Sequence, residues 1–186
     1  MFFHASETAG IKVIKPSISN HEKPLVYLSS KRENTLVYLS NAVKKHCVQI
    51  GYKHTGPYKT WGSYGFNKNG VLQLEEYYPN ATIETYKGVS GFIYSVSQLS
   101  DYEKLEDIPY AVATPNPVEA DNCEFIPDAY EALLEAEKED RLVLTRWEQN
   151  SRDKLNWIEK IIRSEYDNSE KYPEYRVFLR DKFSYI

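Results

Sequence analysis

Two short hydrophobic segments near the start of the chain constrain its fold most strongly. Residues 2–6 (FFHAS) and 25–30 (LVYLSS) are rich in aromatic and branched side chains, which predicts two strands joined by a polar loop. His4 lies near the end of the first strand and Tyr27 in the middle of the second. Side chains alternate along a strand, and loops at strand ends leave room for ligands. We therefore expect His4 and Tyr27 to open into one cleft.

Length and charge limit the classes of protein to consider. The chain has 186 residues, of which 41% are hydrophobic, so it can bury one sizeable core. Its formal net charge of −4 disfavours general nucleic-acid binding, because phosphate contacts require a basic surface. No apolar run approaches the length of a membrane-spanning helix, which is about 18 residues or more. The N-terminus also lacks the pattern of a signal peptide. We expect a cytoplasmic protein that does not enter a membrane.

A helix is predicted directly after the second strand. Ser30 and Glu33 have the spacing of a capping box, in which both side chains satisfy backbone donors at a helix start. Apolar residues then recur at helical spacing as far as Cys47. The pattern predicts one helix over residues 31–47. Residues 51–70, rich in glycine, tyrosine and lysine, predict a long loop.

The rest of the chain alternates strands and helices before a helical end. Strands are predicted over 71–78, 91–96 and 110–114, and helices over 128–138, 151–166 and 173–183; residues 142–144 fit either a short strand or a helix. This order predicts an α+β fold with a mixed, mostly antiparallel sheet. We place this domain over residues 1–146 and a C-terminal helical appendage over 147–186.

Several catalytic chemistries lack their signature in this chain. It has no G-x-S-x-G elbow and no glycine-rich phosphate loop, and Cys47 and Cys123 have no C-x-x-C neighbour. His21, His46 and His54 are scattered in polar or helical contexts, so we expect no metal site.

An acidic residue before the predicted 128–138 helix is the third candidate for a site. Glu124 lies in an apolar setting where a carboxylate could stabilise positive charge on a sugar or orient a ribose hydroxyl. It could equally be a helix cap or a surface residue, and Glu119 and Asp121 are nearby substitutes. His4 and Tyr27 taken singly fit a packed histidine and a core aromatic.

The order of these segments resembles the ADP-ribosyltransferase superfamily. The resemblance rests on FFHAS, then VYLSS followed by a helix, then GFIYSV, and then PVEADNCEFIPDAYEAL, and it covers roughly residues 1–135. It implies a split-sheet α+β fold of the ADP-ribosylation type with a cleft for NAD. His4 and Tyr27 match the first two motif positions, and Glu124, with Glu119 as the alternative, matches the third.

The resemblance also implies a role for each matched residue. His4 would hold the adenosine-side ribose, and Tyr27 would stack on the nicotinamide ring. Glu124 would bind the 2′-hydroxyl of the nicotinamide ribose and stabilise an oxocarbenium-like transition state. The implied activity is NAD-dependent mono-ADP-ribosyl transfer, with NAD as substrate and an unknown acceptor.

Two alternatives remain on the same fold. One is RNA 2′-phosphotransfer, which requires several basic side chains around a phosphate; only Lys31 and Arg32 follow the second strand. The other is a non-catalytic binding module that keeps the fold and has lost turnover. NAD binding separates this module from the enzyme.

Overall fold

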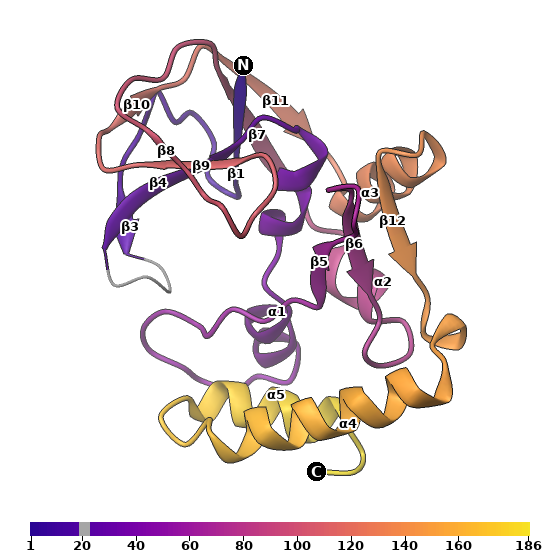
Figure 1. The fold of residues 1–186 in the computed structure, drawn as a ribbon. Coiled ribbons are helices and arrows are strands. Elements are labelled where there is room, and N and C mark those ends of the chain that lie inside the picture. Colours follow the sequence, from indigo (N-terminus) through magenta and orange to yellow (C-terminus); the bar gives the residue numbers. More distant parts are fainter. Residues whose placement is uncertain (19–22) are drawn as a thin grey trace. The chain divides into compact units, whose positions relative to one another are not determined.

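The computed structural model describes residues 1–18 and 23–186 (Figure 1). The chain forms two compact units, each assembled from three separate segments. Unit 1 comprises Met1–Leu39, Gly65–Gln73 and Tyr86–Val143, and unit 2 comprises Ser40–Tyr64, Leu74–Thr85 and Leu144–Ile186. The described helices include none that is long and apolar enough to cross a membrane.

An antiparallel sheet forms the centre of unit 1. Its strands lie in the order β11-β7-β1-β4-β9-β8, with β3 paired to β4 (Figure 1). The strands are β1 (Phe2–Ser6), β3 (Ser17–Ile18), β4 (Pro24–Ser29), β7 (Gly91–Val96), β8 (Glu103–Lys104), β9 (Ala111–Thr114) and β11 (Asn122–Ile126). Two smaller sheets pair β2 (Val13–Ile14) with β10 (Val118–Glu119), and β5 (Tyr64–Phe66), β6 (Leu72–Glu75) and β12 (Leu142–Thr145) in the order β12-β6-β5. The predicted α+β class, with mostly antiparallel sheets, is confirmed.

Each face of the large sheet buries apolar side chains. On one face, an apolar cluster joins the large sheet to β2 and β10: Ile14, Val26, Leu28, Tyr94, Val96, Val112 and Val118. The 3₁₀ helix η1 (Glu33–Leu39) packs on β1 and on α3 (Ala129–Lys138). Gly91 allows η1 to come close, because a Cβ there would lie 2.6 Å from Leu39 Cδ2.

The helix predicted over residues 31–47 is interrupted in the structure. η1 ends at Leu39, and α1 (Ala42–Gln49) begins after Asn41, whose side chain accepts hydrogen bonds from the Val43 and Lys44 amides. The predicted capping box is also wrong, because the Ser30 hydroxyl donates to the Tyr110 carbonyl instead. Serine and asparagine are weak helix formers in helix interiors, and asparagine is a strong N-cap, which fits a new helix start at this point.

Helices dominate unit 2. They are α1, α2 (Ala81–Tyr86, whose last residue belongs to unit 1), the 3₁₀ helix η2 (Trp147–Gln149), α4 (Arg152–Asp167) and α5 (Pro173–Lys182). α5 packs against both α1 and α4. Their shared core includes Val43, Ile158, Ile162, Phe178 and Leu179. The predicted C-terminal helices therefore pack with residues 40–64 and 74–85, which the sequence analysis placed in the N-terminal domain.

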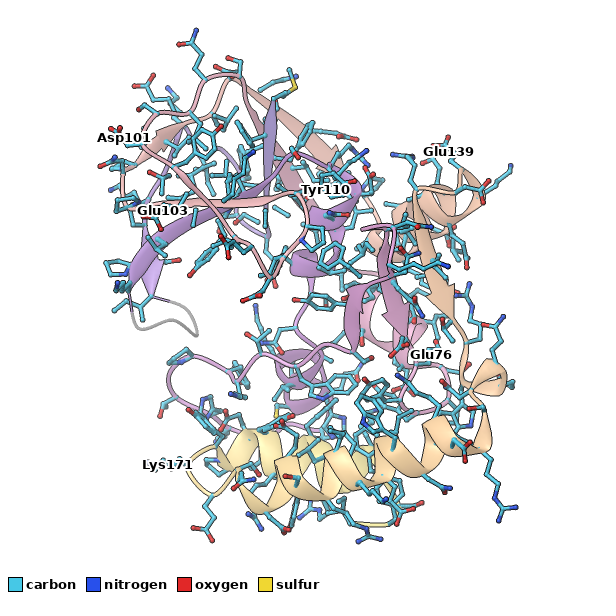
Figure 2. All side chains as sticks on the ribbon, in the orientation of Figure 1. Glu76, Asp101, Glu103, Tyr110, Glu139 and Lys171 are labelled. Carbon is cyan, nitrogen blue, oxygen red and sulfur yellow. The ribbon has the colours of Figure 1, made fainter. Side chains whose placement is uncertain are left out.

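Buried carboxylates fix the irregular segments of unit 2. Glu76, labelled in Figure 2, accepts hydrogen bonds from the backbone amides of Thr82 and Trp147. Glu174 is 1% exposed and accepts a hydrogen bond from the Lys59 amide at 3.1 Å. Backbone donors that would otherwise be buried without partners are satisfied in this way. The long loop predicted after α1 is thereby tied to α5.

Phe178 lies among the aromatic rings of the unit 2 core, near Tyr78 and Tyr175. Its side chain is 0% exposed, and its ring centroid lies 5.2 Å from that of Trp61. We expect Phe178→Ala to lower the free energy of unfolding by about 3–5 kcal/mol, because it leaves a cavity among aromatic rings. Urea unfolding followed by circular dichroism measures this change. Val48→Ala on the exposed side of α1 is the control and should change it by no more than about 0.5 kcal/mol; equal effects of the two would contradict this account of the core.

Candidate functional site

His4 lies on β1 in the middle of the large sheet, next to the strand that carries Tyr27. Its ring nitrogen Nδ1 is 2.9 Å from the backbone carbonyl oxygen of Tyr27. A carbonyl oxygen only accepts hydrogen bonds, so Nδ1 carries the proton and donates. In a fully paired sheet, a backbone amide of the neighbouring strand would donate to such a carbonyl; here the His4 ring donates to the Tyr27 carbonyl instead.

The protonation state of His4 follows from its surroundings. Burial lowers the pKa of His4 below its ordinary 6.5, and the hydrogen bond to the Tyr27 carbonyl offsets only part of this effect. The ring is therefore neutral at pH 7, and its second nitrogen, Nε2, carries no proton. Among the residues that the structure describes, none is a hydrogen-bond partner of Nε2. This nitrogen can accept a hydrogen bond from a ligand hydroxyl.

The side chain of Tyr27 does not share the sheet face of His4. His4 pairs with Tyr94 across β1 and β7, whereas the pair Phe3–Ser29 joins β1 to β4. Because side chains alternate, Tyr27 lies on the face of Phe3, and His4 on the opposite face with Tyr94. The expectation that both side chains open into one cleft is wrong in this respect. The ring of His4 meets the backbone of Tyr27 instead.

Glu124 lies on β11, a strand that the periodicity of the sequence did not predict. It pairs with Ile93 of β7, which in turn pairs with Ala5 of β1. The alternation places Glu124 on the same face as Ile93, Ala5 and Tyr27. The sheet therefore brings Tyr27 and Glu124 to one face, separated by β1 and β7.

The carboxylate of Glu124 is held by Arg32 in a two-pronged ion pair. Arg32 Nε donates to Oε2 at 2.7 Å, and Nη2 donates to Oε1 at 2.6 Å. The hydrogen bonds from Arg32 lower the pKa of Glu124, and those same bonds raise the pKa of Arg32. Half of the Glu124 side chain is exposed, so this ionised carboxylate is accessible from solvent.

The alternative acids, Glu119 and Asp121, lie elsewhere in unit 1. Both line a cavity of about 780 Å³, which falls in the range of small-molecule sites. Its wall includes Phe2 and Tyr102, whose rings meet edge to face at 5.4 Å. Asp121 accepts hydrogen bonds from Ser97, which lower the pKa of its carboxyl. These acids therefore belong to the cavity wall, whereas Glu124 belongs to the ion pair.

The described histidines other than His4 lie beside carboxylates of α5. Residues 1–18 and 23–186 contain no group of three or more potential metal ligands, and His21 lies outside them. His46 Nε2 lies 3.0 Å from Asp181, and His54 Nδ1 lies 3.8 Å from Glu174. These pairs join α1 and the loop after it to α5.

Arg32 is the functional candidate that the sequence analysis missed. Its position was considered only as part of a phosphate site, together with Lys31. Glu124 follows it by 92 residues, and the intervening chain gives no spacing pattern that would pair the two. Only the path of η1 across the sheet reveals this pair.

Comparison of the chain with protein-family models, curated proteins and solved structures finds no match. The assignment of a function therefore depends on the geometry of unit 1 and on the resemblance described above.

The tautomer of His4 is directly testable by ¹⁵N NMR. We expect the neutral ring with the proton on Nδ1 at pH 7, with His4→Gln identifying its signals. Since the folded-state pKa is lowered, the unfolded chain binds the proton first, so the contribution of His4 to stability is lost as pH falls below about 6.5. A proton on Nε2, or titration at or above pH 6.5, would contradict the assignment of Nε2 as an acceptor.

Proposed function

We propose that this chain is an NAD-dependent ADP-ribosyltransferase-like enzyme. The observation that carries the proposal is that Tyr27 and Glu124 lie on one face of the sheet, with the Glu124 carboxylate half exposed as a hydrogen-bond acceptor. A ribose presents hydroxyl donors, which match such an acceptor. The strand order also supports the proposal, because β1, β4 and β11, which carry the three matched residues, belong to one antiparallel sheet.

The three residues divide between two ends of the proposed ligand. The resemblance gives His4 to the adenosine-side ribose, and gives Tyr27 and Glu124 to the nicotinamide end. Tyr27 and Glu124 share one face of the sheet, as the nicotinamide end requires, whereas His4 lies on the opposite face and does not line the same surface. On this proposal, the Tyr27 ring stacks on nicotinamide on the face that carries Glu124, and the resemblance alone assigns a ribose to His4.

Glu124 supplies the electrostatic part of the proposed reaction. The bond between the ribose C1′ and the nicotinamide nitrogen breaks, its electron pair leaves with nicotinamide, and positive charge develops on the ribose. A fixed, ionised carboxylate that accepts a hydrogen bond from the 2′-hydroxyl stabilises this positive charge. A nucleophile on the acceptor then forms the new bond at C1′ and gives up its proton. Arg32 holds the carboxylate in place and lowers the pKa of Glu124 further below neutral pH.

Calorimetry with NAD and an assay of nicotinamide release test the proposal. We expect the wild type to bind NAD, and Glu124→Gln to lower nicotinamide release by about a hundredfold or more while keeping most of the NAD affinity. Glu119→Gln is the matched control and should release nicotinamide at the wild-type rate, since Glu119 lies in the cavity wall.

Three outcomes would change the assignment. A wild type that binds no NAD would favour a binding module of another kind. NAD binding without nicotinamide release would contradict the proposed transfer reaction. A larger loss in Glu119→Gln than in Glu124→Gln would move the catalytic role to Glu119.

A further inference from the structure

We infer that Arg32 is the positioning residue for Glu124: its guanidinium orients the carboxylate while leaving part of the carboxylate available to a ribose hydroxyl. This inference rests on the proposed function and extends it to a residue outside the three matched positions. Arg32 acts through Glu124, and we assign it no contact with the substrate.

The geometry of the pair accounts for both parts of this role. The two bonds, at 2.7 and 2.6 Å, join a planar guanidinium to a planar carboxylate, so rotation of either group would break one of them. A carboxylate has about four lone-pair positions, and Arg32 occupies two. The side chain of Glu124 is 50% exposed and that of Arg32 is 25% exposed, so the remaining positions can be reached from solvent.

Arg32 can orient its partner because its own backbone is fixed. The Arg32 carbonyl accepts hydrogen bonds from the Thr35 amide at 3.0 Å and from the Thr35 hydroxyl at 2.7 Å. The next residue back, Lys31, donates its amide to the Ser29 hydroxyl at 3.1 Å. These bonds fix the short connection between β4 and η1, so the arginine reaches Glu124 from a preorganised backbone.

Other charges nearby cannot replace Arg32. Glu33 of η1 and Glu135 of α3 interact with Arg32 through their negative charge, which favours its ionised form. Arg141, between α3 and β12, lowers the pKa of Glu124 by its charge alone and makes its ion pair with Glu139 at 2.5 Å. Among the described residues, Arg32 is therefore the dominant cation at Glu124 and the one that hydrogen bonds to it.

The test measures nicotinamide release by full-length Arg32→Ala and Arg32→Lys across pH, with NAD affinity by calorimetry. We expect Arg32→Ala to lower kcat by about 10- to 100-fold, by analogy with residues that hydrogen-bond to and orient metal ligands. The acid limb of the pH dependence of kcat should lie at higher pH in Arg32→Ala than in the wild type, because Glu124 loses the partner that lowers its pKa. Arg32→Lys keeps the charge but not the two-pronged geometry, so it should restore the pH limb and leave kcat reduced.

Two further measurements separate positioning from a general effect on the fold. Lys31→Ala removes a neighbouring cation, which lies over the Tyr110 ring at 5.2 Å, and should leave kcat and the pH limb unchanged. ¹³C NMR titration of Glu124 should give a higher pKa in Arg32→Ala than in the wild type. This second measurement does not depend on turnover, and circular dichroism checks that each variant is folded.

The outcomes distinguish failure of the inference from failure of the proposed function. Wild-type activity with unchanged kcat and pH limb in Arg32→Ala would overturn the inference and leave the function standing. An unchanged Glu124 pKa in Arg32→Ala would also overturn it. A wild type that neither binds NAD nor releases nicotinamide would overturn both.

Discussion

Unequal pairing of the central strand β1 is the constraint on which the candidate site depends. β1 pairs with β7 over all its residues, Phe2 to Ser6, whereas the pair Phe3–Ser29 joins it to β4. Beyond that pair, the carbonyl of Tyr27 accepts a hydrogen bond from the ring of His4. This bond fixes the tautomer of His4 and leaves Nε2 as an acceptor. A fully paired sheet would leave the ring without this partner.

Packing of η1 on the sheet face that carries Glu124 determines where the Arg32–Glu124 ion pair forms. η1 lies against β1 and α3, and Gly91 provides the room that the Leu39 side chain occupies. This path starts η1 at Glu33, directly after Arg32, which reaches across the sheet to β11. The path of η1 across the sheet thus both covers the apolar side chains of this face and brings Arg32 to Glu124. A change in the η1 path would move the guanidinium away from Glu124.

Local patterns predicted the elements that bury alternate or helically spaced apolar residues. Strands β1, β4, β7 and β9 and helices α3, α4 and α5 lie close to their predicted ranges. The break between η1 and α1 was missed because apolar spacing continues through it, although Asn41 is a strong cap. β11 was missed because four of its five residues are exposed and give no alternating pattern.

The α+β class, the central strands and the candidates His4, Tyr27 and Glu124 can all be reached from the sequence. These follow from side-chain type and local periodicity, which act over a few residues. Only the tertiary structure decided that His4 and Tyr27 lie on opposite faces, that Glu119 lines a separate cavity, and that Arg32 holds Glu124. Strand register and the path of η1 fix these relations, and both depend on packing between residues far apart in the chain.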